Sequence, residues 1–170
     1  MTFDHDAAAP SGQKKVLDAW RRRLHGRNFI THEDIDIPAI NRELAYVSVL
    51  SCEGGQFRFR LAGTGLQHIF GCEARGKTAD EIDACRGGSM WAELATRSML
   101  RSMPISGSTR MPDGGVHYWL RLPMSSDGVE ADMVLCHDRY LPAEALVDPD
   151  RAASRIDMLL RLDCGDLVAA

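Results

Sequence analysis

The fold is decided by the stretch Phe57-Arg58-Phe59-Arg60-Leu61-Ala62-Gly63-Thr64-Gly65-Leu66. Its apolar residues Phe57, Phe59 and Leu61 alternate with two arginines, which is the period of a half-buried strand. Gly63 and Gly65 then give the backbone the freedom for a sharp reversal, and the following residues read as a short helix. We therefore expect a strand, a turn and a helix in succession, with the two arginines on the face opposite the three apolar residues.

Similar patterns on either side predict the other elements. They are a helix over residues 13–25, a strand over 44–50, a helix over 90–103, and strands over 105–111, 116–122 and 129–137. Glycine-rich and proline-rich turns separate the later strands. Because strands and helices come in separate runs, we expect an α+β fold with an antiparallel sheet.

We divide the chain into four parts by composition. They are a disordered lead over 1–12, an amphipathic helix over 13–25, a sheet domain over 26–142 and a helical tail over 143–170. The helix carries an apolar stripe that we expect to pack on the sheet of this chain or of a second copy. This candidate dimer or partner surface consists of Val16, Leu17, Trp20 and Leu24.

The tail repeats an apolar residue at helical spacing. The residues concerned are Ala152, Ile156, Leu159 and Leu160. The final Ala169-Ala170 resembles the tag that the bacterial Clp unfoldase reads, and a frayed helix end explains it as well.

Composition and charge exclude several classes of protein. A net charge of −4 and an isoelectric point near 5.8 argue against nucleic-acid binding, which relies on neutralising phosphates. No apolar run approaches the roughly 20 residues of a membrane-spanning helix, and the acidic first residues carry no secretory signal. Five cysteines without a Cys-x-x-Cys pair are typical of free thiols in a reducing cytoplasm.

Several motifs along the chain together resemble one known family. They are Trp20, Asp36-Ile37-Pro38, Phe59-Arg60-Leu61-Ala62-Gly63-Thr64, Phe70-Gly71, Gly76 and Tyr140-Leu141-Pro142. The set resembles the PAS domain, in particular the bacterial subfamily in which an arginine-rich strand ends in Gly-Thr. The resemblance implies a five-stranded antiparallel sheet with short helices across one face, and a sensor or interaction module. No kinase, cyclase or DNA-binding segment is recognised, so the expected output passes through a partner protein.

The resemblance leaves the cofactor open. Flavin photosensors of the family carry a reactive cysteine in an Asn-Cys-Arg-type motif, but here Cys72 stands between Gly71 and Glu73. Haem-binding members need an axial imidazole on the helical side of the pocket, for which His68 is the only residue in a suitable place. A lone histidine near an apolar helix face is more often a core or surface residue, so we do not expect haem.

Aromatic residues predict a ligand pocket between the sheet and its helices. The candidate ligand-binding residues are Tyr46, Phe57, Phe59, Leu61, His68, Trp91, Leu94 and Trp119. Trp91 and Trp119 are expected to face the same interior space, with His68 near its rim. The opposite phase of Trp119 stays open, because the other residues of its strand also alternate correctly for burial. The alternative for the whole set is that it fills the core.

Three patterns that suggest catalysis or metal binding are set aside. Gly63-Thr64-Gly65 resembles a dinucleotide fingerprint, but His68 replaces its third glycine and no parallel strand follows. Residues 32–36 have the composition of a metal site, yet their side chains point in different directions. Cys136 and His137 are neighbours on a strand and project to opposite faces, so they cannot act as nucleophile and base.

These observations predict a cytoplasmic regulatory module and not an enzyme. We expect it to bind a small ligand, a partner protein or both, and to form a homodimer. Two alternatives stay open: a cofactor-free dimerisation adaptor with a filled core, and a small-molecule enzyme that uses the same cavity. No pair of titratable groups is arranged by sequence to shift each other's pKa in one cleft, which disfavours the enzyme.

Overall fold

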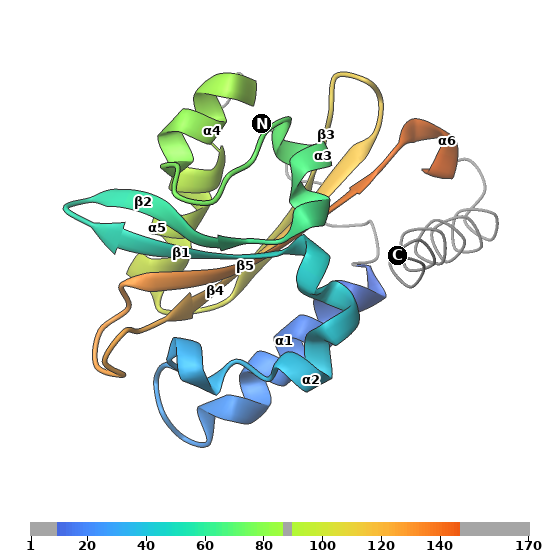
Figure 1. Cartoon of the computed structure of the whole chain (residues 1–170). Helices are drawn as coiled ribbons and strands as arrows, with labels where there is room; N and C mark the ends of the chain where they lie inside the picture. Colours follow the sequence, from blue (N-terminus) through green and yellow to red (C-terminus); the bar gives the residue numbers. More distant parts are fainter. Residues whose placement is uncertain (1–9, 87–89, 147–170) are drawn as a thin grey trace, which may run out of the picture.

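The computed structural model describes residues 10–86 and 90–146 of the chain. Figure 1 labels the elements on the ribbon. In chain order they are α1 (Ser11–Leu24), η1 (His32–Asp34), α2 (Ile37–Ile40), η2 (Asn41–Tyr46), β1 (Val47–Glu53), β2 (Gln56–Ala62), η3 (Thr64–Leu66), α3 (Gln67–Phe70), α4 (Ala79–Arg86), α5 (Met90–Arg101), β3 (Ile105–Arg110), β4 (Val116–Met124), β5 (Met133–Leu141) and α6 (Ala143–Leu146).

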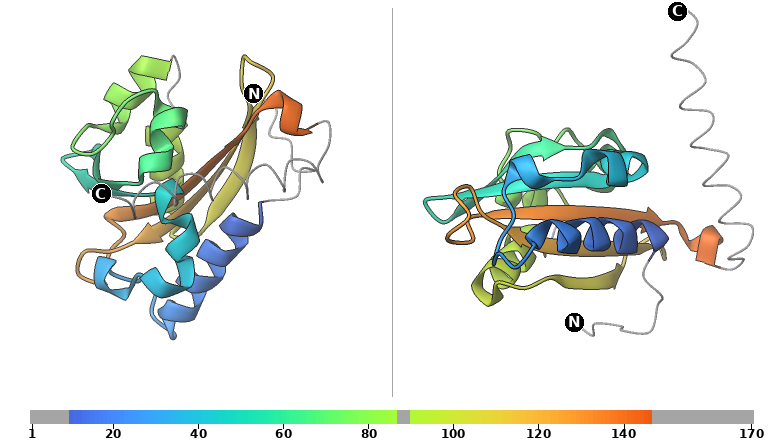
Figure 2. Two further views of the ribbon diagram at one scale, coloured as in Figure 1. Left: turned by 45° about the vertical axis from the view of Figure 1, so that its right-hand side comes forward. Right: turned by 90° about the horizontal axis from the view of Figure 1, so that it is seen from below.

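The five strands form one antiparallel sheet in the order β2-β1-β5-β4-β3. Helix α1 lies across one face of this sheet, and α3, α4 and α5 lie on the other (Figure 1, Figure 2). We call the face under α3, α4 and α5 the inner face, and the face under α1 the outer face. The predicted α+β fold is confirmed, and α1 adds a cover to the second face.

Each face has its own apolar core. The inner core includes Leu50, Phe57, Phe59, Leu66, Ile69, Phe70, Ile82, Trp91 and Val134. The outer core includes Val16, Ala19, Trp20, Val47, Val49, Leu120, Leu122, Met124 and Leu135. Full burial of one such side chain contributes about 1.5–3 kcal/mol to stability. The two cores therefore hold helices against both faces.

Strand β2 departs from strict alternation at Arg60. Its pairing with β1 sets Leu50 opposite Phe59 and Val49 opposite Leu61, so Arg60 is an extra residue. Such a β-bulge turns the side chains beyond it to the other face of the sheet. Leu61 consequently shares the outer face with Val49 near the sheet edge, and it is 47% exposed. The prediction that Leu61 is buried beside Phe59 is wrong.

Helix α1 packs on the sheet of its own chain. Val16 and Trp20 are buried in the outer core, and Leu17 and Leu24 are partly buried against it. Trp20 also donates a hydrogen bond from Nε1 to the carbonyl oxygen of Pro123 at 3.2 Å. The stripe expected as a dimer or partner surface is therefore occupied within the chain and is not free for a partner. The helix begins at Ser11, inside the predicted lead.

Two strands are displaced from their predicted positions. β1 begins at residue 47 and not at 44, because residues 41–46 form η2. The last strand, predicted over 129–137, is β5. A polar loop delays its start: Asp127 Oδ1 accepts from the backbone N–H of Val129 at 2.8 Å, and Asp132 Oδ1 accepts from that of Ser126 at 2.7 Å. Such side-chain bonds to the backbone stabilise turns in place of a strand ladder.

No helix among residues 10–86 and 90–146 is long and apolar enough to cross a membrane. Three predictions lie outside the described residues. They are the lead over residues 1–9, the apolar tail pattern of Ala152, Ile156, Leu159 and Leu160, and the Ala169-Ala170 end.

Candidate functional site

Alternate residues of β4 carry a polar and aromatic stripe on the inner face. The strand is buried along its whole length. His117, Trp119 and Arg121 lie on the inner face, while Leu120 joins the outer core. Asp138 of β5 lies directly opposite Trp119. Diagonal neighbours on paired strands are within reach of long side chains, so Asp138 meets both His117 and Arg121.

We call His117, Arg121 and Asp138 the inner cluster; all three are 0% exposed. His117 Nε2 lies 2.8 Å from Asp138 Oδ1. Arg121 donates to both carboxylate oxygens, from Nη2 to Oδ1 at 2.9 Å and from Nη1 to Oδ2 at 3.1 Å. This two-pronged geometry is the strongest form of an arginine–carboxylate pair. It offsets part of the cost of burying the charges.

The environment keeps Asp138 ionised. Burial alone raises the pKa of its carboxyl group, but the charge of Arg121 and the hydrogen bond from His117 outweigh burial, so the pKa of Asp138 falls below its ordinary value. An ionised carboxylate only accepts, so the shared proton belongs to His117 Nε2. Burial raises the pKa of the neighbouring Cys136 thiol to about 12. That thiol therefore stays protonated and unreactive.

The first turn of α5 covers the inner cluster through Trp91. Its ring stacks on His117 with centroids 5.3 Å and planes 24° apart. The guanidinium carbon of Arg121 lies 5.9 Å from the Trp91 ring centroid, within the range of cation–π attraction. Asp83 of α4 fixes this turn by accepting from the backbone N–H groups of Trp91 and Ala92 at 3.2 and 3.4 Å. Burial raises the pKa of Asp83, although those hydrogen bonds oppose the rise.

Three buried nitrogen atoms of this group have no hydrogen-bond partner within the described part of the chain. They are Trp91 Nε1, His117 Nδ1 and Arg121 Nε. Each such atom costs about 1–3 kcal/mol when it is left unpaired in an interior. The indole and guanidinium nitrogens can only donate, whereas His117 Nδ1 accepts when the ring is neutral. With a neutral His117 ring, the group therefore contains two unpaired donors and one unpaired acceptor.

The structure brings together part of the predicted pocket. Phe57, Phe59 and Trp91 lie in the inner core, and Leu94 is buried on α5. Phe70 links two of them, with ring centroids 5.3 Å from Phe59 and 4.9 Å from Trp91. These aromatic contacts fill the space above β1 and β5.

Trp119 lies on the same face of the sheet as the inner cluster, since it alternates with Leu120 of the outer core. Its ring covers Gly107 of β3, where an added Cβ would come within 2.5 Å of the ring. Its Nε1 donates to Thr109 Oγ1 at 3.2 Å. Trp119 therefore turns towards the edge of the sheet, and His117 takes the place next to Trp91.

Three residues of the predicted pocket lie elsewhere. Leu61 is on the outer face because of the bulge. His68 is exposed, because α3 turns its other side to the core. The imidazole considered for haem therefore does not face the interior. Tyr46 ends η2 instead of lying in a strand, and its ring contacts His137 and Arg139.

The sequence prediction misses all three members of the inner cluster. A signal is present in the alternation of His117, Trp119 and Arg121 within an otherwise apolar strand, which marks a polar stripe on one face. Asp138 carries no such signal. Its partners depend on the register between β4 and β5, which is set by the whole hairpin.

A second polar pair lies on the outer face. His137 Nε2 is 3.0 Å from Glu43 Oε2, and both residues are buried. Glu43 lies under the first turn of α1, where an added Cβ at Gly12 would overlap its carboxylate. The hydrogen bond from His137 lowers the pKa of Glu43, while burial opposes this. Cys136 belongs to the inner core, so the prediction that Cys136 and His137 face opposite sides is confirmed.

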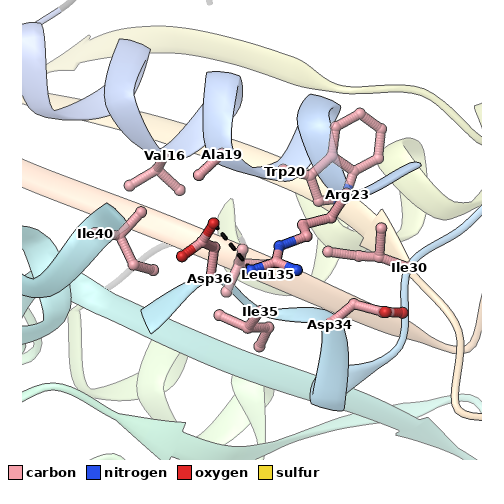
Figure 3. Close-up of a pocket in the computed structure, with 10 residues that line it drawn as sticks. All are labelled: Val16, Ala19, Trp20, Arg23, Ile30, Asp34, Ile35, Asp36, Ile40 and Leu135. Carbon is pink, nitrogen blue, oxygen red and sulfur yellow. Dashed lines mark ion pairs between the residues drawn. The ribbon is translucent and has the colours of Figure 1, made fainter. Parts of the chain in front are cut away.

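A cleft lies between α1 and residues 30–40, over the outer face of the sheet (Figure 3). It is lined by Val16, Ala19, Trp20, Arg23, Ile30, Asp34, Ile35, Asp36, Ile40 and Leu135. The ion pair between Arg23 and Asp36, at 3.1 Å, spans it. Its volume of about 200 Å³ includes the part open to solvent. Pockets for drug-sized ligands hold about 300–1,000 Å³, so this cleft is too small for a cofactor.

Residues 32–36 do not form a metal site. Asp34 forms an ion pair with Arg27 at 2.9 Å and accepts from the backbone N–H of Thr31 at 2.8 Å. These hydrogen bonds lower the pKa of Asp34. Across the described ranges, no three His, Cys, Asp or Glu residues come together as ligands for a metal ion.

Comparison with known proteins gives a family and distant similarities to solved structures. The family model of the PAS domain matches residues 8–111, more than half of the chain. A solved structure described as "Structure of an RNA-binding Light-Oxygen-Voltage Receptor" is similar with 14% sequence identity and a TM-score of 0.43. The alignment covers 76% of this chain and 39% of that one. No curated protein matches the sequence.

Proposed function

The chain belongs to the PAS domain family, and on this premise we propose that it is a regulatory module that senses a small ligand at the inner cluster. The family supports a sensory role. The observation that carries the ligand proposal is the set of unpaired nitrogens on Trp91, His117 and Arg121. Apolar residues in place of buried ion pairs are often neutral or stabilising. A core selected only for stability would therefore gain nothing from a buried ion pair with unpaired nitrogens beside it.

Strand β5 provides a physical route from the site to the outside of the module. Asp138 anchors the inner cluster, and its neighbour His137 holds Glu43 beneath α1 on the outer face. A ligand that moves the inner cluster would shift both residues together. We propose that the altered position of α1 is what a partner protein reads.

The proposal also covers the cellular compartment of the module and the proteins with which it acts. We place it in the cytoplasm, acting as a homodimer or through a regulatory partner. Free thiols at Cys52, Cys72 and Cys136 agree with a reducing compartment. The proposal contains no catalytic step, because the Cys136 thiol is inert and His137 lies on the opposite face.

The second candidate is a cofactor-free dimerisation adaptor. The aromatic contacts from Phe59 through Phe70 to Trp91 favour it, because they fill the interior without a ligand. In this reading the unpaired nitrogens are satisfied by buried water, which proteins commonly contain.

Mass spectrometry of the full chain, purified gently from its host, separates the two candidates. We compare the mass under native conditions with the mass after denaturation. A small molecule that is released on denaturation supports sensing, and its retention should fall in Trp91→Phe but not in Trp20→Phe. If the native and denatured masses are equal, and incubation with a host metabolite extract adds no mass, the sensing proposal is refuted and the dimerisation adaptor is supported.

A further inference from the structure

We propose that the inner cluster takes a neutral ligand with an amide-type edge, meaning a carbonyl oxygen beside an N–H group. Primary amides, lactams and cyclic imides have such an edge. The inference rests on the proposed function and names the chemical class of its ligand.

The unpaired donors require an acceptor on the ligand. Trp91 Nε1 and Arg121 Nε each carry one hydrogen and cannot accept, and both are buried without a partner in the described structure. The two side chains lie close together, since the guanidinium carbon is 5.9 Å from the indole ring centroid. One carbonyl oxygen has two lone pairs and can accept from both groups.

The third unpaired atom requires a donor on the ligand. His117 Nε2 lies 2.8 Å from Asp138 Oδ1, and in the neutral form of the ring that donates this hydrogen, Nδ1 keeps a lone pair. The imidazole stacks against the Trp91 ring with planes 24° apart. A planar group that reached all three atoms would meet two donors, on Trp91 and Arg121, and one acceptor, on His117. A carbonyl beside an N–H group matches that pattern.

The charges around the site disfavour an ionised ligand. Both guanidinium ends of Arg121 already bind Asp138, at 2.9 and 3.1 Å. The buried Asp83 also acts on the charge of Arg121. An anion would add a third acidic group around one arginine, and burying an unmatched charge is costly. A cation would meet two donors that cannot accept from it.

Three molecules of nearly the same shape test the inference on the full chain. They are acetamide, acetate and acetamidinium, which are neutral, anionic and cationic. The indole N–H signals of the three tryptophans, assigned from single Trp→Phe variants, are followed by NMR during each titration. We expect acetamide to move the Trp91 signal in a saturable way, with acetate and acetamidinium at least about fivefold weaker, since leaving one charge or hydrogen bond unmatched costs at least this much.

Matched variants locate the effect. In Trp91→Phe, which keeps a ring but loses the donor, we expect acetamide binding measured from the β4 backbone amides to weaken by about fivefold to tenfold. Trp20→Phe makes the same change on the outer face, where Nε1 is already bonded to Pro123, and should leave binding unchanged.

Each contrary result overturns the inference. Tighter binding of acetate or acetamidinium refutes the neutral ligand, and equal binding to wild type and Trp91→Phe refutes the site. A further outcome is that none of the three molecules moves the Trp91 indole signal, while the same NMR spectra show a long-lived contact between that N–H group and bound water. In that case the unpaired atoms are hydrogen-bonded to water and the inference is refuted. An ionised molecule retained by the native protein would refute this ligand class while the sensing proposal stands. Selective binding of acetamide by a protein that retains no molecule from its host would support the ligand class and refute the sensing proposal.

Discussion

The two faces of the sheet are both buried, but they are built on different principles. The outer face is mainly aliphatic apart from Trp20, and its polar pair, Glu43 and His137, lies under the start of α1. The inner face carries His117, Arg121 and Asp138 among its apolar residues, all without solvent contact. Apolar burial stabilises the outer face directly. The inner cluster must recover the cost of desolvating its charges through geometry alone. Stability is therefore concentrated in the two apolar cores, while the inner cluster and the outer pair, whose His137 Nδ1 is also unpaired among the described residues, add buried polar groups that must be offset.

The difference between the two faces is tested most directly in strand β2, because the bulge places its apolar residues Phe59 and Leu61 on opposite faces of the sheet. Phe59→Ala removes a fully buried ring from the inner core and should lower the free energy of unfolding by about 3–5 kcal/mol. Leu61→Ala removes a half-exposed side chain and should change it by less than about 0.5 kcal/mol. Urea denaturation of both variants measures these values. Comparable losses would mean that Leu61 is buried and that the bulge is absent.

The bulge also shows where sequence patterns stop predicting structure. Phe57, Phe59 and Leu61 alternate perfectly, so the pattern alone puts all three on one face. Two contacts outside the strand break it. Phe59 must face Leu50 in the inner core, while a Cβ at Gly63 would overlap the backbone of residues 44–45. The chain fits both constraints by inserting one residue, and no local signal records this.

The helices and turns follow their local signals more closely. Asp36 caps α2 by accepting from the backbone N–H of Ala39 at 3.2 Å, and aspartate just before a helix with Pro38 in its first turn is a common local signal for a helix start. Gly54 and Gly55 both have positive φ in the β1–β2 turn, which only glycine adopts freely. The candidate site is harder to predict because it joins residues of β4 and β5 to Trp91 of α5. Such contacts depend on register and helix placement, which the local sequence does not encode.

The ionised state of the inner cluster can be tested by a change of one atom. Asp138→Asn keeps the shape of the side chain but leaves Arg121 as an unmatched buried charge. Breaking a buried pair in this way should destabilise the protein by about 3 kcal/mol or more. Adding Arg121→Met to this variant removes the unmatched charge and should recover much of the loss. Thermal and urea unfolding give both values.

An exposed ion pair provides the control. Asp36 pairs with Arg23 at 3.1 Å, and nearly half of the arginine side chain is exposed, 46%. Asp36→Asn keeps a residue that can cap α2, so its effect should stay below about 1 kcal/mol. A small effect for Asp138→Asn as well would show that the inner face holds no ionised pair.

The polar pair of the outer face should make the stability of the protein depend on pH. The pKa of Glu43 is lowered, first by its hydrogen bond from His137 and then by the charges of His137, Arg139 and Lys15, against the effect of burial. A carboxylate with a depressed pKa stabilises the fold fully above its unfolded pKa, and this contribution is lost as the pH falls through the folded value. Glu43→Gln should therefore cost about 1–2 kcal/mol at pH 7, and the gap from wild type should close below about pH 4.5. A gap of constant size across that range would rule out an ionised Glu43.

The smallest predicted effect concerns Gly12, where two opposing effects should nearly cancel. An alanine in place of glycine within a helix normally stabilises it by up to about 1 kcal/mol. At residue 12, however, the new Cβ would overlap the carboxylate of Glu43. The carboxylate must then move away from His137, so the two effects should cancel and Gly12→Ala should change stability by less than about 0.5 kcal/mol. In a Glu43→Ala background the obstacle is gone, and Gly12→Ala should stabilise the protein by about 0.5–1 kcal/mol. A double-mutant cycle measures this difference as a coupling energy. Perfect additivity would mean that α1 does not rest on Glu43, and the link from β5 to α1 would lose its physical basis.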